Sequence, residues 1–242
     1  MTFLEKLEPG VKGFVLIDKP KGIPSFRCVS ILRRITREKR VGFAGTLDPL
    51  ASGLMIMAVG REYTKRLDEF AKLDKTYEVE IELGKVSDSY DADGVVTDYA
   101  FSGENSSSSK NMNNTFVSAV LDKNFIQAKV DDNFLGERDQ VPPIFSAVHV
   151  NGKRAYELAR SGKEVELKSR KVIFYEIKVL AYEWPLLSLK IHCSSGTYVR
   201  SFANDLGVLL GCGGYVKDLR RTKIGDFKIE DVIIGLGSTF YN

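Results

Sequence analysis

The sequence predicts an α+β fold in which helices flank a mixed β-sheet. Two observations support this class. Strand-like segments come in pairs, and segments with apolar residues at helical spacing lie between them. No repeat and no linker divides the 242 residues, and a chain of this length can bury a full hydrophobic core. We therefore expect one domain over residues 1–242.

The first half of the chain alternates strand and helix patterns. Apolar runs at 13–20 and 54–59 predict buried strands, because loop-forming or charged residues bound each run. Residues 61–73 have the spacing of a helix. Residues 76–83 alternate strictly between apolar side chains on one face and glutamates or Thr76 on the other, which predicts a strand with one face in solvent.

A further helix is predicted after Pro24. Ser25 can cap it, because a serine hydroxyl accepts a hydrogen bond from a free backbone N–H of the first turn. The apolar face of this helix is expected to consist of four residues at helical spacing: Phe26, Val29, Leu32 and Ile35.

The second half contains two more strands and a helix. Strands are expected at 171–181 and 186–193, and a helix at 201–210. Residues 141–166 combine a Pro-Pro turn, an Asn-Gly turn and a short helix with exposed basic residues. Residues 101–114 are polar and of low complexity, which predicts a disordered surface loop.

Composition excludes several classes of protein. The three cysteines are widely spaced and form no CxxC pair, which indicates a reducing compartment, so we expect a cytoplasmic protein. The two histidines, His149 and His192, form no ligand set with cysteines, so no metal site is predicted. No apolar run has the length of a membrane span. No P-loop, GxGxxG or GxSxG pattern occurs, and no cofactor is predicted.

Positive charge is concentrated near the N-terminus. Residues 12–40 contain nine lysines and arginines against two acids, although the net charge of the chain is only +3. Such segregated positive charge suits a polyanion partner, although a solvated helix face explains a charge run more often. Asp91 and Asp93, in the DADG sequence at 91–94, fit turn chemistry better than metal binding, because Ala100 falls where an EF-hand requires a bidentate glutamate.

The segment GTLDPLASG, residues 45–53, places one carboxylate among small residues. Gly, Asp, Pro and Ser are typical of turns, and a plain turn is one interpretation. Alternatively, the small neighbours let a bulky ligand approach, while Pro49 biases Asp48 toward an extended backbone and fixes the direction of its carboxylate.

Five segments together distinguish the two interpretations. In order along the chain, GTLDPLASG, KTYEVEIELG, QVPPIFSAVHVNGKRAYELAR, GTYVRS and LRRTKIG resemble the bacterial-type tRNA pseudouridine-55 synthases, the TruB family. The similarity extends from about Gly13 to Asp231. It implies the pseudouridine synthase fold, a mixed curved sheet flanked by helices, with residues 141–166 as an inserted thumb that grips RNA. A C-terminal PUA domain, which many members carry, is not expected.

The resemblance also implies an activity: isomerisation of the T-loop uridine of tRNA, uridine-55, to pseudouridine without a cofactor. Moving uracil from an N-glycosidic to a C-glycosidic bond requires a nucleophile that can attack and then leave, and a carboxylate does both. The base must first be extruded from the folded RNA. The expected partner is the T-arm stem-loop of tRNA, with no membrane and no obligatory protein partner, and a monomer is expected.

The catalytic residues implied by the family motifs are Asp48, Arg200 and Tyr77. Asp48 is the nucleophile. Arg200 pairs with it and keeps it ionised in a dry pocket, whereas a surface arginine at a helix start would oppose the helix dipole. Tyr77 stacks on the target base, although its place on the apolar face of a strand also fits a core residue.

Four further residues are implied to bind substrate. Tyr198 and Leu219 match residues that line the uridine pocket, and Lys19 matches a lysine near that pocket, with an ordinary exposed lysine as the alternative. Phe43 stands where GHxGTLDP has histidine, so we expect this position to act by shape and stacking and not by proton transfer.

Two other functions are compatible with the same motifs. One is a guide-RNA-dependent pseudouridine synthase that works inside a ribonucleoprotein. The other is a non-catalytic module that binds tRNA or acts as a tRNA chaperone. The sequence also leaves open whether Asp48 attacks the uracil ring or the ribose carbon.

Overall fold

The structure is a computed structural model, and it describes residues 7–99, 121–146, 148–150, 152–155, 158, 161, 166–232 and 234–235. The chain forms two compact units: unit 1 contains residues 1–78 and 219–242, and unit 2 contains residues 79–218. The predicted loop at 101–114 lies outside the described residues, as does part of the predicted thumb. The single domain stays a prediction.

Unit 1 contains a mixed sheet built around β3 (Ser52–Val59). This strand pairs antiparallel with β1 (Gly13–Lys19) and β2 (Val41–Ala44), and parallel with β12 (Gly214–Ile224). β14 (Ile234–Gly235) runs parallel to β1. The smaller elements are β13 (Phe227–Lys228), which pairs with β12, and the 3-10 helix η1 (Ile229–Asp231).

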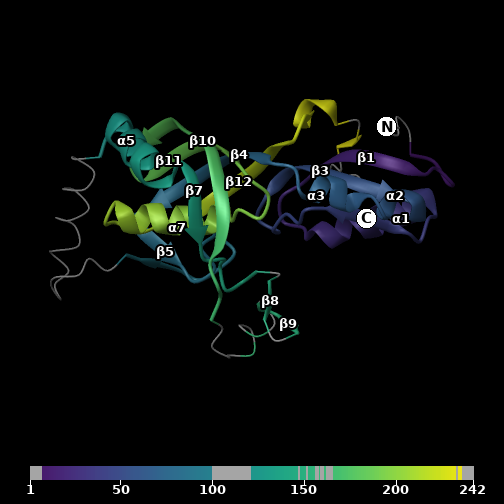
Figure 1. Cartoon of the computed structure of the whole chain (residues 1–242), viewed down its shortest axis with the longest axis horizontal. Helices are drawn as coiled ribbons and strands as arrows, with labels where there is room; N and C mark the ends of the chain where they lie inside the picture. The colour runs from purple at the N-terminus through teal and green to yellow at the C-terminus, as the bar shows by residue number, and fades with distance from the viewer. Residues whose placement is uncertain are drawn as a thin grey trace. The chain divides into compact units, whose positions relative to one another are not determined.

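Helices of unit 1 pack on this sheet (Figure 1). α1 (Ser25–Thr36) contacts β2 and β3, while α2 (Arg61–Thr64) and α3 (Leu67–Ala71) replace the single helix predicted at 61–73. Phe70 of α3 packs edge-on against Phe14 of β1, with ring centroids 4.8 Å apart. These rings belong to one core cluster with Leu16, Ala44, Leu54, Ile56, Ala58 and Ile224.

Two details of the α1 prediction are wrong. Its N-cap is Pro24, and no side chain caps the helix, so Ser25 does not serve as the cap. Phe26 is exposed, and the buried side of the helix is rotated toward Cys28 and Ile31, together with Val29 and Leu32. Helical spacing alone does not distinguish the predicted buried residues from the observed ones, because both sets contain Val29 and Leu32.

Unit 2 contains an antiparallel arrangement centred on β10 (Arg170–Glu183), which pairs with β11 (Leu186–Cys193) on one side and β7 (Gly136–Gln140) on the other. The sheet order places β4 (Lys75–Leu83) beside β11. Both β4 and β12 contribute residues to each unit. The predicted α+β class with a mixed sheet is confirmed.

The remaining elements of unit 2 surround these strands (Figure 1). α7 (Val199–Leu209) packs through Phe202, whose ring centroid lies 4.8 Å from that of Phe134 in α5 (Lys123–Phe134). Two short hairpins complete the unit: β5 (Lys85–Ser87) with β6 (Val96–Asp98), and β8 (His149–Val150) with β9 (Lys153–Arg154). The second hairpin belongs to the 141–166 segment, and Asn151 of the predicted Asn-Gly turn lies outside the described residues.

The glutamate face of β4 is less exposed than predicted. Glu82 is buried, accepts a hydrogen bond from the Tyr215 hydroxyl at 2.8 Å and forms an ion pair with Lys85 at 2.8 Å. Burial raises the pKa of Tyr215 to about 12, and the hydrogen bond to Glu82 adds to the effect. Burial alone would raise the pKa of Glu82, but the bonds from Lys85 and Tyr215 outweigh it and lower that pKa.

Candidate active site

The predicted nucleophile lies in the loop between β2 and β3, which we call the catalytic loop (residues 45–51). Asp48 is half-buried between Leu47, which is buried, and Pro49, which is exposed. The N–H of Ala51 donates to the Asp48 carbonyl at 3.1 Å, so the segment is a turn as well as a candidate site. The two interpretations of GTLDPLASG are therefore compatible with each other.

Ser25 fixes the residue immediately before Asp48. Its buried hydroxyl donates to the Leu47 carbonyl at 2.7 Å and accepts from the Leu47 N–H at 2.9 Å. One side chain thus satisfies both backbone groups of Leu47. This is the role of Ser25 in place of the predicted cap.

Lys19 is fully buried, so the alternative of an ordinary exposed lysine is wrong. Its ammonium group donates to the carbonyls of Pro20 at 2.9 Å and Ile23 at 2.8 Å, and more weakly to that of Pro49 at 3.5 Å. The N–H of Gly22 donates to the same Pro49 carbonyl at 2.8 Å. Lys19 therefore joins the turn after β1 to the residue that follows Asp48.

Arg221 of β12 holds the start of the catalytic loop. The guanidinium group is buried and donates from Nε to the Leu54 carbonyl at 2.8 Å and from Nη2 to the Gly45 carbonyl at 3.2 Å. The last residue of GTLDPLASG, Gly53, has to be a glycine. Its φ is +110°, and a Cβ there would lie 2.3 Å from the Arg221 carbonyl oxygen. Sequence reasoning missed Ser25 and Arg221 as supports of this loop.

Three other predicted site residues belong to unit 1 with Asp48. Tyr77 on β4 and Leu219 on β12 are both buried, and Phe43 on β2 is half-buried opposite Met57 of β3. Burial of Tyr77 is compatible with a core role and with a base-stacking role, so its assignment stays a prediction.

Arg200 lies in the first turn of α7 and is buried, so it is not a surface arginine. Its Nη1 donates to the Ser89 carbonyl at 3.0 Å and lies 3.4 Å from a carboxylate oxygen of Asp91, and its Nη2 donates to the Phe145 carbonyl at 3.0 Å. Three separate contacts thus hold the guanidinium group. The expected pairing with Asp48 joins residues of different units and stays a prediction.

Asp91, which the sequence assigned only to a turn, contacts the predicted site residue Arg200. It is buried, accepts a hydrogen bond from the Ser89 hydroxyl at 2.5 Å and another from the N–H of Asp93 at 3.1 Å. These bonds agree with the predicted turn chemistry. The ion pair with Arg200 adds a role, because a buried guanidinium group needs a counter-charge.

The residue before α7 is also fixed. Tyr198 is half-buried, and Arg170 lies over its ring at 5.5 Å. The buried side-chain amide of Gln140 accepts from the Tyr198 N–H at 2.8 Å and donates to the Tyr198 carbonyl at 3.0 Å. GTYVRS and the start of QVPPIFS are therefore joined through a single amide group.

Comparison with known families decides the identity of these motifs. The model of the TruB family pseudouridylate synthase N-terminal domain matches residues 33–199, and the model of the tRNA pseudouridylate synthase B C-terminal domain matches residues 200–234. The chain belongs to the TruB family of pseudouridylate synthases. The predicted family is confirmed.

Named relatives of this TruB-family chain are closely similar over most of its length. The tRNA pseudouridine synthase B of Protochlamydia amoebophila is 42% identical over 225 residues, which are 93% of this chain and 79% of the relative. The protein of the same name from Clostridium kluyveri is 40% identical over 221 residues, 91% of this chain and 70% of the relative.

Solved structures confirm the pseudouridine synthase fold. A chain in the crystal structure of a Cbf5-Nop10-Gar1 complex is 26% identical with a TM-score of 0.66, and covers 93% of the TruB-family chain. A chain in the structure of an H/ACA RNP bound to a substrate RNA containing 2'-deoxyuridine gives a TM-score of 0.63 at 23% identity. Our chain spans about half the length of these two, 52% and 51%.

Two further findings concern the described residues only. No three His, Cys, Asp or Glu side chains in these parts of the chain are grouped where they could hold a metal ion. None of the helices described there has both the length and the apolar character to cross a membrane.

Proposed function

We propose that this TruB-family protein isomerises uridine-55 in the T-loop of tRNA to pseudouridine, with Asp48 as the nucleophile. The observation that supports it most directly is the position of Asp48 in a loop whose backbone is hydrogen-bonded by three buried side chains: Lys19, Ser25 and Arg221. Relatives about 40% identical are named tRNA pseudouridine synthase B.

The reaction balances without an oxidant, reductant or second substrate. The Asp48 carboxylate attacks either C6 of the uracil ring or C1' of the ribose, and the bond between N1 and C1' breaks. The base turns, C5 forms a new bond to C1', and the carboxylate leaves. The proton on C5 is released to solvent and N1 takes up another. The substrate and product are isomers, so we propose turnover with no cofactor and no metal.

The other predicted residues position the carboxylate of Asp48 and the uracil base of the substrate. Arg200 pairs with the Asp48 carboxylate, and Asp91 holds Arg200 in place. Tyr77 stacks on the extruded uracil. The uridine pocket is proposed to include Phe43, Tyr198 and Leu219. Lys19 supports the catalytic loop through its contact with the Pro49 carbonyl. We propose that the 141–166 segment grips the T-arm, and that the chain acts as a monomer without a protein partner.

A guide-RNA-dependent enzyme is the second candidate, because structural neighbours come from the Cbf5-Nop10-Gar1 and H/ACA RNP complexes. Their identities of 23% and 26% are well below the 42% of the Protochlamydia relative. Sequence similarity therefore favours bare tRNA as the substrate.

The test is tritium release from tRNA labelled at uridine C5, with the purified chain and excess EDTA. We expect multiple turnovers by the wild type and none by Asp48→Asn, with tRNA binding by the variant nearly unchanged, because the amide keeps the shape but is not a nucleophile. Substantial turnover by Asp48→Asn would refute the assignment. Turnover only after addition of a guide RNA and protein partners would favour the second candidate.

A further inference from the structure

The exposed face of α1 carries an aromatic side chain that the fold does not use. Phe26 is 60% exposed and is the most exposed aromatic residue that the structure describes, ahead of Tyr175 at 51% and Phe125 at 39%. Hydrophobic residues elsewhere in α1 are buried or half-buried. A single exposed hydrophobic residue is ordinary by itself, so its surroundings decide whether it is a site.

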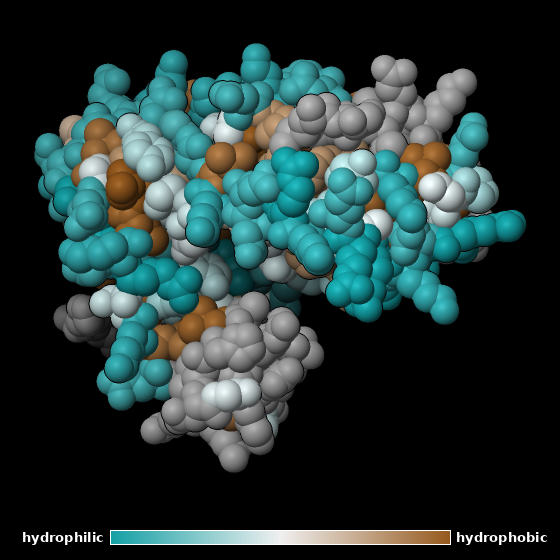
Figure 2. All heavy atoms as spheres, turned by 45° about the vertical axis from the view of Figure 1, so that its right-hand side comes forward, coloured by the Kyte–Doolittle hydropathy of each residue, from teal (hydrophilic) through white to brown (hydrophobic). Residues whose placement is uncertain are grey.

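Cations surround this ring. The guanidinium carbon of Arg33 lies 5.8 Å from the centre of the Phe26 ring, two helical turns further along the same face. Arg27 and Arg34 are exposed on α1 as well, and the helix contains no acidic residue. Hydrophilic side chains cover much of this side of the molecule (Figure 2). An aromatic ring beside several arginines is suited to a nucleobase with its phosphates.

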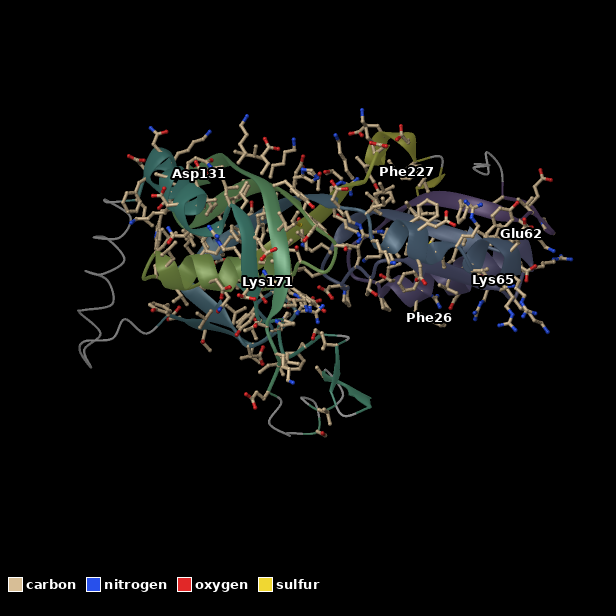
Figure 3. The ribbon with its side chains drawn as sticks, viewed as in Figure 1. Phe26, Glu62, Lys65, Asp131, Lys171 and Phe227 are labelled. Atoms are coloured by element: carbon tan, nitrogen blue, oxygen red, sulfur yellow. The ribbon has the colours of Figure 1, made fainter. Side chains whose placement is uncertain are left out.

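The position of Phe26 relates it to the catalytic loop. The preceding residue, Ser25, bonds both backbone groups of Leu47, which precedes Asp48. Ser25 is buried and Phe26 is exposed on the same first turn of α1, and Phe26 lies at the lower border of unit 1 in Figure 3. Thr46 and Pro49 of the loop are exposed too. Phe26 therefore directly follows, in the chain, the side chain that holds the residue before Asp48.

We propose that Phe26, with Arg33 beside it, is a stacking platform for a second unpaired nucleobase of the tRNA T-loop, distinct from the uridine that reaches Asp48. Arg27 and Arg34 contact the flanking phosphates. The proposal rests on the proposed function in taking tRNA as the ligand. It adds a binding site outside the uridine pocket, and it accounts for an aromatic residue at the surface of a basic helix.

The test compares Phe26→Ala with a matched control. Phe125→Ala removes another exposed aromatic ring with a cation over it, Lys129 at 5.5 Å, from α5 of unit 2. For both variants we would measure KM, kcat and Kd for full-length tRNA and for an isolated T-arm stem-loop, together with a thermal melt. Phe26→Tyr provides the conservative rescue.

We expect Phe26→Ala to raise Kd and KM by about five- to a hundredfold for both RNAs, the value of one stacked base, with most of the loss in kcat/KM arising from KM. Phe26→Tyr should restore binding, and Phe125→Ala should match the wild type. An unchanged Kd for Phe26→Ala would overturn the proposal. A weakened Kd for full-length tRNA with unchanged binding of the stem-loop would overturn the T-loop as the source of the base.

A spectroscopic readout separates this site from the chemistry. Phe26→Trp should show tryptophan emission that is quenched when the T-arm stem-loop is added, beyond the signal of the single native tryptophan, Trp184, measured in the wild type. Quenching does not require turnover. If Asp48→Asn kept its activity, the proposed nucleophile would fail while quenching still supported the platform; absence of quenching with normal turnover would overturn the platform alone.

Discussion

Replacing Ser25 by alanine should lower the turnover rate by more than the loss of folding stability alone explains. The hydroxyl donates to the Leu47 carbonyl at 2.7 Å and accepts from the Leu47 N–H at 2.9 Å, and all three groups are buried. Leaving buried backbone groups without a partner costs roughly 1 to 3 kcal/mol each. The catalytic loop can avoid part of that cost by moving toward water, and Asp48 would move with it.

A displacement of this kind acts on the rate. A shift of a reacting group by about 1 Å can cost on the order of a hundredfold in rate. We therefore expect the single-turnover rate of Ser25→Ala at saturating tRNA to fall by about ten- to a hundredfold, as measured by tritium release from C5-labelled uridine. Lys19 and Arg221 still hold the other parts of the loop, so the rate should not fall to that of Asp48→Asn.

Thr36→Ala is the matched control. Its hydroxyl is equally buried, donates to the Leu32 carbonyl at 2.7 Å and belongs to the same helix, but it lies at the opposite end from the catalytic loop. Both variants should lower the melting temperature, and only Ser25→Ala should lower the rate. If Ser25→Ala turns over at the wild-type rate while its melt falls as far as that of Thr36→Ala, Ser25 supports the fold and not the nucleophile.

Three further predictions concern other parts of the molecule. Asp91→Asn should lower turnover at least about tenfold with little change in tRNA binding by filter assay, because Arg200 loses a buried counter-charge; wild-type turnover would contradict this. Phe43→His should be nearly silent and Phe43→Ala should lower kcat/KM by about ten- to a hundredfold, whereas a destabilised Phe43→Ala with normal single-turnover kinetics would show that the ring only fills the core. Burial raises the pKa values of the Cys28 and Cys212 thiols to about 11, so iodoacetamide at pH 8 should modify them only after unfolding; rapid labelling of the native protein would disprove it.

Local patterns predicted five strands, missed others such as β2, β7 and β12, and failed where tertiary contacts decide. The strands expected at 13–20, 54–59 and 186–193 were located correctly because apolar runs bounded by loop residues specify them locally. In contrast, Glu82 was expected in solvent, since strict alternation places it opposite the apolar face of β4. It is buried because Tyr215 of β12, distant in the sequence, covers it and donates a hydrogen bond.

The same distinction applies to the site. Asp48, Arg200 and Tyr77 were assigned to the site through motifs, but Asp91 was assigned only to a turn. Its bonds to Ser89 and Asp93 are local and could be predicted from the DADG sequence, whereas its ion pair with Arg200 depends on how α7 packs in unit 2. A local pattern can therefore identify a turn without revealing which distant charge the turn will face.

The supports of the catalytic loop show why a sequence motif can predict a nucleophile but not how that residue is positioned. Lys19, Ser25 and Arg221 are buried polar residues from three separate segments, and burial of such groups is unfavourable unless they are hydrogen-bonded. Their partners include backbone carbonyls of the catalytic loop, and a backbone carbonyl has no residue-specific signal in the sequence. These bonds form on folding, before RNA arrives. The orientation of Asp48 is thus set by the stability of unit 1, and in the proposed reaction the binding energy of the tRNA remains available to extrude the uridine.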